Sequence, residues 1–529
     1  MLLGDEAIAR GGMDAGMSGI YAYPGTPSTE IMEYVQNNFS AAAGNIFCQW
    51  SANEKTAFEA ALGMSYTGKR SMACMKHVGL NVAADPFMNA AITGVNGGFL
   101  LVVADDPSMH SSQNEQDSRY YGKFAMIPVL EPINQQEAYD MVFYGFELSE
   151  KYKLPVMIRI TTRLAHSRSA VMPAAQLKQN VTGLPSDPVQ FVLLPGIARR
   201  RYRGLLDVQK ELVTESANSP WNNFTDGSDK SAGIIACGLA YNYLIEAYRG
   251  KQPTNPVLKI GQYPLPEDLV GKITGTCERV LVLEEGYPIV EEMLRGFPVT
   301  SAKISGRMDG TLPRDGELNP DIVAGALGMP FEKGPAIPSI VKNRPPSFCA
   351  GCGHIDMFNA LLQSIDGYGP GRVFSDIGCY TLGALEPYNA INTCVDMGAS
   401  ITMAKGAADA GLHPSVCVIG DSTFTHSGMT GLLDAVNDRS AITVLIGDNS
   451  TTGMTGGQKS SATGRIEDIC AGIGVDPDHI KVINPLKKHH DENVKIINRE
   501  LEYRGVSVVI ARRECIQVAM RRKKEEKSR

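Results

Sequence analysis

The sequence predicts an α/β protein of three domains, built from parallel sheets flanked by helices. Helical and strand patterns alternate through residues 1–170, which is typical of a parallel sheet with helices on both faces. The alternation resumes at residue 233 and again after residue 336. Between Val416 and Gln458, two apolar β-branched runs enclose a segment long enough for a crossover helix, which predicts a βαβ unit.

The first domain is expected to span residues 1–193. Ser28 precedes an expected helix and is the expected N-cap. The patterns predict helices over 2–15, 30–38 and 54–66, and strands over 20–23, 99–104 and 156–161.

Two further domains are expected after a linker. Residues 194–232 are rich in Pro, Ser, Asn, Asp and Arg, which predicts a connection between domains. A smaller α/β domain over 233–335 carries strands at 234–237 and 280–283, and a Pro-rich stretch at 334–346 separates it from the third domain, 336–529.

Composition excludes several classes of protein. A formal net charge of −7 argues against general nucleic-acid binding. We find no apolar run of membrane-spanning length, and the acidic start of the chain lacks the pattern of an export signal. The eleven cysteines are an odd number in a large chain, which favours reduced thiols or metal ligands over disulfides. We therefore expect a cytoplasmic protein.

The βαβ unit carries the strongest chemical signal. Its strands, 416–419 and 442–446, stop at Gly420-Asp421 and Gly447-Asp448, with Asn449 following. Polar loops at the carboxyl ends of parallel strands are where open α/β sheets bind ligands. Asp421 and Asn449 offer hard oxygen ligands suited to Mg²⁺, and a diphosphate would complete the coordination. One such pair is an ordinary turn, but this spacing is typical of enzymes that use thiamine diphosphate.

Glu54 is the expected catalytic carboxyl group. It begins a predicted helix with small residues behind it, which allows close packing. A glutamate that hydrogen-bonds the aminopyrimidine of thiamine promotes deprotonation of the thiazolium carbon. The alternative is a favourable charge in a first helical turn.

Three loop residues are candidates for substrate binding or proton transfer. Thr26 follows a predicted strand and is placed to hydrogen-bond a substrate carboxylate or carbonyl, although the loop is also a plain turn. His77 and His110 likewise follow strands and are expected to bind an anionic substrate or shuttle protons. Each histidine is as readily explained as a loop residue held by backbone hydrogen bonds.

Four cysteines predict a metal site in the third domain. Cys349 and Cys352 lie on one turn, while Cys379 and Cys515 follow predicted strands. Thiolates from such scattered positions favour a [4Fe–4S] cluster, with structural zinc or plain buried thiols as alternatives. Apolar neighbours instead indicate a core position for Cys394, Cys417 and Cys470.

Several stretches carry a family resemblance. The chain resembles the thiamine-binding large subunits of the indolepyruvate:ferredoxin oxidoreductases, within the 2-oxoacid:ferredoxin oxidoreductase superfamily. The resemblance covers nearly the whole chain and rests on residues 4–11, 23–28, 75–81, 105–117, 375–383 and 420–458.

The resemblance implies a pyrimidine-binding domain, then a transketolase C-terminal-like domain, then a diphosphate-binding domain. It implies Mg²⁺ at Asp421, Asn449 and the Thr451 carbonyl, and a [4Fe–4S] cluster on the four cysteines. It also implies coenzyme A as co-substrate and a hetero-oligomer with a small γ-type subunit. The residues expected to bind the cofactor are Glu54, Gly353, His354, Gly420, Asp421, Ser422, Thr423, Asn449, Thr451, Met454 and Thr455.

The sequence departs from the family pattern in three places. Gly353 stands where the family usually has Pro, and Met454 stands where pyruvate-specific relatives have a polar Asn. Relatives usually continue into a cysteine-rich ferredoxin-like domain, whereas this sequence ends in a basic segment, 521–527, expected to be a solvated tail. We therefore expect a separate ferredoxin, or a ferredoxin-like or flavin-linked subunit, to accept the electrons.

The expected activity is oxidative decarboxylation of an aromatic 2-oxoacid to an acyl-CoA, because an apolar Met454 suits a bulky substrate. The alternatives are non-oxidative decarboxylation to an aldehyde and a non-catalytic scaffold subunit that keeps the fold without the cofactor.

Overall fold

The computed structural model describes residues 1–38, 46–187, 190–296, 302–313, 316–330, 334, 337–342, 346–394, 397–409 and 412–528. The chain forms two compact units, Met1–Pro335 and Ala336–Arg529. The Pro-rich boundary predicted at 334–346 lies partly outside the described residues, and the division between the units falls within it. Further division of the first unit at residue 193 stays a prediction.

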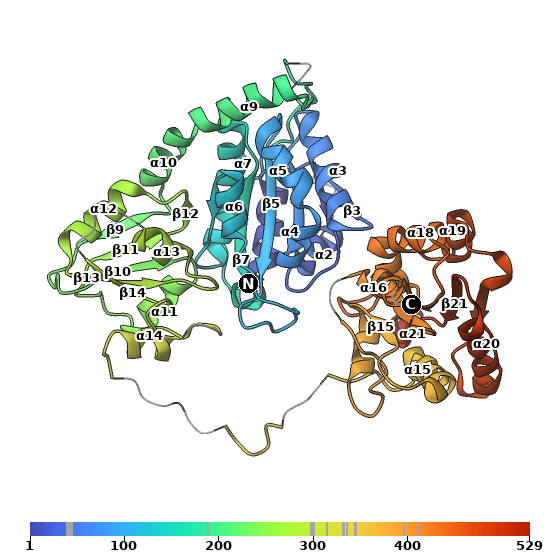
Figure 1. Ribbon diagram of the computed structural model, residues 1–529. Helices are drawn as coiled ribbons and strands as arrows, with labels where there is room; N and C mark the ends of the chain where they lie inside the picture. The colour runs from blue at the N-terminus through green and yellow to red at the C-terminus, as the bar shows by residue number, and fades with distance from the viewer. Residues whose placement is uncertain are drawn as a thin grey trace. The chain divides into compact units, whose positions relative to one another are not determined.

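The first unit contains a seven-stranded sheet in the order β12-β6-β7-β5-β4-β2-β3 (Figure 1). All neighbouring strands run parallel except β12, which is antiparallel to β6. The strands are β2 (Gly19–Ala22), β3 (Phe47–Trp50), β4 (Ser71–Lys76), β5 (Phe99–Asp105), β6 (Val129–Leu130), β7 (Val156–Thr161) and β12 (Gln262–Tyr263). The alternation in the sequence therefore correctly predicted a mainly parallel sheet.

Helices cover both faces of this sheet because its central strand is apolar on both sides. In β5, Leu100 and Val102 enter one hydrophobic core, whereas Phe99 and Leu101 enter another. On the first face lie α1 (Gly4–Asp14), α2 (Thr29–Asn37), α7 (Gln135–Tyr152) and α8 (Thr162–His166). On the second lie α3 (Glu54–Tyr66), α4 (His77–Val82) and α5 (Ala84–Thr93), with α6 (Arg119–Ala125) against α5.

Ser28 occupies the N-cap position of α2, but it does not cap the helix with its side chain. Its hydroxyl instead donates to the Gly25 carbonyl at 2.8 Å, which tightens the loop before the helix. The expected side-chain cap was therefore wrong.

A five-stranded sheet completes the first unit, in the order β14-β13-β10-β11-β9. Its strands are parallel except β9. They are β9 (Asn223–Thr225), β10 (Gly233–Cys237), β11 (Val257–Ile260), β13 (Arg279–Leu283) and β14 (Lys303–Ser305). The accompanying helices are α11 (Ala240–Ala247), α12 (Glu267–Thr276), α13 (Ile289–Arg295) and α14 (Pro320–Ala326).

The segment predicted as an irregular linker is largely helical. It forms α9 (Pro195–Asp207), α10 (Gln209–Ala217) and strand β9 (Figure 1). α9 contacts α5 of the first sheet, and α10 contacts α12 of the second. α9 buries only Leu205, so it lacks the apolar stripe from which a helix is recognised in a sequence.

Buried ion pairs join the two sheets of the first unit. Arg119 donates to Asp117 at 2.5 Å and lies 3.1 Å from Glu284, which follows β13. Arg159 of β7 donates to Asp105 at 2.8 Å and to the Glu285 carbonyl at 3.1 Å. Each buried arginine thus has acidic partners, as the burial of a charge requires.

The second unit contains a five-stranded, fully parallel sheet in the order β15-β16-β17-β21-β20. The strands are β15 (Val373–Ser375), β16 (Ser415–Gly420), β17 (Ile442–Asp448), β20 (Ile480–Ile483) and β21 (Ser507–Arg512). α15 (Gly353–Ile365) and α20 (His490–Glu502) pack together on one side, and α16 (Ala399–Asp409), α18 (Met429–Asn437) and α19 (Ile466–Ile473) lie on the other. The predicted βαβ unit is confirmed, with β16 and β17 adjacent and parallel.

The crossover after β16 differs from the single helix that was expected. It begins as α17 (Asp421–Thr423), widens into a π-helical turn at 424–428, and continues as α18. Such π turns occur often at functional sites.

The basic segment predicted as a solvated tail belongs to helix α21 (Ile516–Ser528). Arg521 of this helix donates to the Gly456 carbonyl at 2.6 Å. Short elements elsewhere are β1 (Leu2–Leu3), β8 (Arg168–Ser169), β18 (Thr451–Thr452), β19 (Gln458–Lys459), η2 (Asp366–Tyr368), η3 (Cys379–Ala384), η5 (Pro477–His479) and η6 (Lys487–His489). Over the described stretches of the chain, no helix is long and apolar enough to cross a bilayer.

Candidate active site

Four of the predicted metal ligands of the second unit follow the carboxyl ends of four adjacent parallel strands. Cys379 follows β15, Asp421 follows β16, Asn449 follows β17 and Cys515 follows β21. Because parallel strands end at the same edge of a sheet, these four residues gather at one edge.

Asp421 carries a carboxyl group that is almost completely buried. The side chain is 2% exposed, and its Oδ2 atom has no hydrogen-bond partner in the described part of the chain. Burial raises the pKa of Asp421 to about 7, and the nearby Asp448 carboxylate adds to the shift. An orphaned oxygen of this kind fits a divalent cation, because a cation supplies the missing neutralisation.

The Asn449 loop is held by its own polar groups. The Thr451 N–H donates to Asn449 Oδ1 at 3.1 Å, and Thr451 Oγ1 donates to the Gln458 carbonyl at 2.8 Å. Thr455 donates to Gln458 Oε1 at 2.5 Å. The side chain of Met454, on the same loop, is 60% exposed.

Hydroxyl groups connect the Asp421 turn to its neighbours. Ser422 Oγ and Thr452 Oγ1 lie 2.9 Å apart, and Thr423 donates to the Ile377 carbonyl at 3.1 Å. Gly420 lies against the ring of Tyr380, where a Cβ would be 2.7 Å from Cε1. The predicted residues 420–423 thus form one packed turn against β15 and β18.

The four predicted cysteines line a single pocket. Other predicted residues line it too: Gly353, His354 and Asn449. Burial, followed by the influence of Cys352, Cys515 and Cys349, raises the pKa of the Cys379 thiol to about 12. The structure therefore brings together thiols that are up to 166 positions apart, from Cys349 to Cys515.

The cysteine sulfurs are not spaced for one zinc ion. Tetrahedral zinc with Zn–S bonds of 2.3 Å holds its sulfurs about 3.8 Å apart. In the described chain, no three of these sulfurs lie within 4.8 Å of one another. A multinuclear cluster, in which each thiolate binds a different iron, requires a wider spacing of the sulfurs than one zinc ion does.

His354 is a buried, neutral member of this pocket. Burial lowers the pKa of His354 to about 4, and its Nδ1 atom lies 3.4 Å from Cys352 Sγ. A Cβ on Gly447 would lie 3.0 Å from His354 Nε2, so glycine makes room for the ring. The backbone of Gly353 lies close to Arg513, where a Cβ would be 3.3 Å from that side chain.

Two predicted residues and one further lysine lie at the carboxyl edge of the first unit's sheet. Thr26 follows β2, Glu54 follows β3 and Lys76 ends β4. Glu54 is 4% exposed and rests on Gly79, where a Cβ would be 2.6 Å from Glu54 Cγ and Oε1. The Thr26 carbonyl accepts a hydrogen bond from Ser111 Oγ at 3.3 Å.

Lys76 is a functional candidate that sequence reasoning did not select. Its ammonium group donates to the Ser111 carbonyl at 2.9 Å, and its stem packs against Gly25. Burial lowers the pKa of Lys76 to about 8, against the opposing influence of Asp106 and Glu54. A lysine that ends an otherwise apolar strand was the signal available in the sequence.

The two predicted histidines differ in their surroundings. His77 is buried, with Nε2 at 3.2 Å from the Asn114 carbonyl and Nδ1 without a partner in the described residues. The His110 side chain is half exposed, and its Nε2 atom lies 3.0 Å from Glu317. Both remain predicted catalytic residues.

Comparison with known proteins shows the family to which this chain belongs. The family model "Pyruvate flavodoxin/ferredoxin oxidoreductase, thiamine diP-bdg" matches residues 10–186, and "Thiamine pyrophosphate enzyme, C-terminal TPP binding domain" matches residues 376–509. The chain is 41% identical over 542 aligned residues to the indolepyruvate oxidoreductase subunit IorA of Archaeoglobus fulgidus, covering 97% of this chain and 86% of that protein. The chain belongs to the IorA family of the 2-oxoacid:ferredoxin oxidoreductases.

Other relatives agree. The IorA subunit of Methanothermobacter thermautotrophicus is 40% identical, again over 97% of this chain and 86% of that protein. A 2-oxoglutarate:ferredoxin oxidoreductase structure from Magnetococcus marinus has a TM-score of 0.50 at 17% identity, covering 62% of this chain and 64% of that chain, and supports the fold. IorA family membership makes this chain a thiamine-diphosphate-dependent, 2-oxoacid-oxidising subunit of a multi-subunit enzyme.

Proposed function

We propose that this subunit catalyses oxidative decarboxylation of an aromatic 2-oxoacid with coenzyme A. The products are the acyl-CoA and carbon dioxide, and two electrons pass one at a time through a [4Fe–4S] cluster to a ferredoxin-like acceptor. The observation that carries the proposal is the pocket that the four cysteines share with Asn449, beside the Asp421 turn.

The shared pocket supports a coupling of decarboxylation to oxidation. Cys349, Cys352, Cys379 and Cys515 are the proposed cluster ligands, and Asn449 links their pocket to the proposed cofactor site. Electron transfer favours a short path, which this adjacency provides. A purely non-oxidative decarboxylase has no use for such a pocket.

The proposed metal ligands are Asp421, Asn449 and the Thr451 carbonyl. The unpartnered oxygen of Asp421 and the neighbouring Asp448 create a local negative charge that Mg²⁺ and a diphosphate would balance. The residues proposed to contact the cofactor around this turn are Gly353, His354, Gly420, Ser422, Thr423, Met454 and Thr455. When bound, thiamine diphosphate supplies a nucleophilic carbon and accepts the electrons released by decarboxylation.

Glu54 and Lys76 are proposed to act at the first unit's sheet edge. Glu54 holds the aminopyrimidine and a proton, and its burial against Gly79 fixes the carboxyl group in one position. Lys76 is proposed to bind the substrate carboxylate, with Thr26 nearby as a hydrogen-bond donor and His77 or His110 moving protons.

An aromatic substrate is supported by two observations. The relatives above carry the name indolepyruvate oxidoreductase. Met454, on the loop beside the cysteine pocket, offers an exposed apolar surface that suits a planar ring. The proposed partners are a small γ-type subunit and a ferredoxin, or a ferredoxin-like or flavin-linked subunit.

Two measurements test the proposal. Anaerobically purified complex should show broad iron–sulfur absorption that bleaches when a 2-oxoacid and coenzyme A are added. In a panel of substrates, indolepyruvate and phenylpyruvate should give higher kcat/KM values than pyruvate or 2-oxoglutarate. Colourless protein that releases an aldehyde, or a preference for pyruvate, would contradict the proposed reaction or the proposed substrate respectively.

A further inference from the structure

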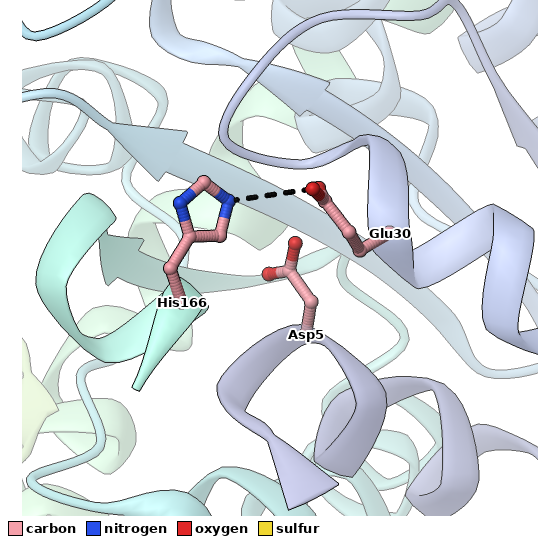
Figure 2. Close-up of side chains that lie close together, drawn as sticks. All are labelled: Asp5, Glu30 and His166. Carbon is pink, nitrogen blue, oxygen red and sulfur yellow. Dashed lines mark ion pairs between the residues drawn. The ribbon is translucent and has the colours of Figure 1, made fainter. Parts of the chain in front are cut away.

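A group of three metal-ligating side chains lies in the first unit, beside the helix that follows the Tyr23–Ser28 loop. Asp5 is in the first turn of α1, Glu30 is in the first turn of α2, and His166 ends α8 (Figure 2). One ligand atom from each of them lies within 4.8 Å of the other two. Figure 2 shows the Asp5 carboxylate directed toward the space between the other two side chains.

We propose that Asp5, Glu30 and His166 bind a first-row divalent cation such as Mn²⁺ or Zn²⁺. The donor set is one imidazole nitrogen and carboxylate oxygens, which suits these ions better than Ca²⁺. This site is independent of the thiamine and cysteine sites.

The strongest support is the unpartnered state of Asp5. Its side chain is fully buried, and both of its carboxylate oxygens lack a hydrogen-bond partner in the described part of the chain. Oε2 of Glu30 is buried and unpartnered as well. Buried carboxylate oxygens are normally satisfied, so three in one place leave room for a cation or a proton.

The surroundings allow a cation to enter and hold it. The side chains of Glu30 and His166 are 35% and 36% exposed, which leaves a path from solvent. His166 Nε2 lies 3.6 Å from Glu30 Oε1, close enough for both to bind one ion after a small movement. α1 and α8 are in close contact, since a Cβ on Gly4 would lie 2.3 Å from the Leu164 carbonyl.

A proton is the competing occupant. Burial raises the pKa of Asp5 well above its ordinary range, and Glu30 adds to the shift. A protonated Asp5 would donate its hydrogen to Glu30 and remove one of the two negative charges that a metal would need. The two cases predict opposite responses to added metal.

A bound cation would connect three helices around the substrate loop. Glu30 lies four residues after Thr26, and α1 contacts both α2 and α8. The ion would therefore hold the start of α2 and, with it, the Tyr23–Ser28 loop.

Manganese binding, measured by the electron paramagnetic resonance of free Mn²⁺, tests the site. The protein is cluster-loaded, thiamine-free and carries Asp421→Ala, so that the other proposed cation site is removed. We expect one bound Mn²⁺ per chain, with affinity lowered at least tenfold by Glu30→Gln or His166→Asn. Glu33→Gln, one turn along the same helix, is the matched control and should bind as the parent does.

Thermal unfolding of the wild-type complex gives a second readout. Saturating Mn²⁺ or Zn²⁺, with thiamine diphosphate and Mg²⁺ already bound, should raise the unfolding temperature by a few degrees. Glu30→Gln should remove this increase. Unchanged Mn²⁺ binding in both Glu30→Gln and His166→Asn, or no thermal response in the wild type, would overturn the site in favour of a shared proton.

Discussion

Gly79 leaves the space in which the carboxyl group of Glu54 lies. A Cβ at residue 79 would come within 2.6 Å of Glu54 Cγ and Oε1. No side chain adopts such a contact without moving its neighbour. The position of the proposed catalytic carboxyl group thus depends on a residue 25 positions later in the chain.

Gly79→Ala should therefore displace the Glu54 carboxyl group and lower turnover about tenfold to a hundredfold. Gly63→Ala is the matched control, because a Cβ there meets nothing within 4 Å. Steady-state kinetics of both variants measures the effect. Equal turnover in the two variants would show that the Gly79 contact does not position Glu54.

Glu54→Gln should keep thiamine diphosphate bound but lower turnover by about a hundredfold or more, because the amide does not transfer a proton. Calorimetry of cofactor binding and steady-state turnover separate the two effects. Near-normal turnover would assign proton transfer to another carboxyl group.

Asp421→Ala should abolish binding of thiamine diphosphate and Mg²⁺ while the chain stays folded. The substitution removes the unpartnered oxygen that we propose as a metal ligand. Calorimetric titration with cofactor and Mg²⁺ measures the loss. Asp434→Ala, on helix α18, is the control and should bind normally; unchanged affinity in Asp421→Ala would remove it from the site.

Cys379→Ser should strongly reduce the iron content of anaerobically purified protein, whereas Cys417→Ser should leave iron bound. Cys379 lines the shared pocket, while Cys417 lies in the core with its thiol against the Thr443 carbonyl. Iron analysis and visible absorption give the comparison. Equal loss from both variants would contradict the choice of ligands.

Activity should fall above pH 8 because Lys76 loses its positive charge. Because burial lowers the pKa of Lys76 to about 8, its positive charge is present below that pH and is lost above it. The KM for the 2-oxoacid should therefore rise as pH increases through 8. Lys76→Arg should move this rise to higher pH, since arginine keeps its charge, and Lys76→Met should raise KM about tenfold or more at pH 7. A Lys76→Met KM equal to that of the wild type would remove Lys76 from substrate binding.

The lowered pKa of Lys76 has the opposite effect on stability: the folded state should become more stable as pH rises. The folded pKa lies below the ordinary 10.5, so the buried ammonium costs folding free energy at pH values below 8. The free energy of unfolding should gain a contribution between pH 8 and 10.5, and this gain should be absent in Lys76→Met.

The strands and the second unit's site were predictable because their signals are local. Apolar β-branched runs gave β5, β7, β16 and β17, and topology then placed Asp421, Asn449, Cys379 and Cys515 at one sheet edge. Strand direction alone decides this grouping, so no side-chain detail was needed.

Features that depend on contacts between residues far apart in the chain could not be predicted from the sequence. α9 and α10 were missed because they bury few side chains, and the role of Gly79 appears only when Glu54 lies against it. The same is true of the group formed by Asp5, Glu30 and His166. Asp5 and His166 are 161 positions apart in the sequence, and only the packing of their helices brings them together.

The buried ion pairs of the first unit make each of its two sheets depend on residues of the other. Arg119 and Arg159 on one side find acceptors on the other at Glu284 and the Glu285 carbonyl. Exchanging one sheet for that of a relative without an acid at position 284 would remove a buried partner of Arg119, at a cost of about 3–5 kcal/mol. Chimaeras that join such a relative's second sheet to this first sheet within residues 194–232 should therefore accumulate less folded protein than chimaeras that keep both sheets from one parent.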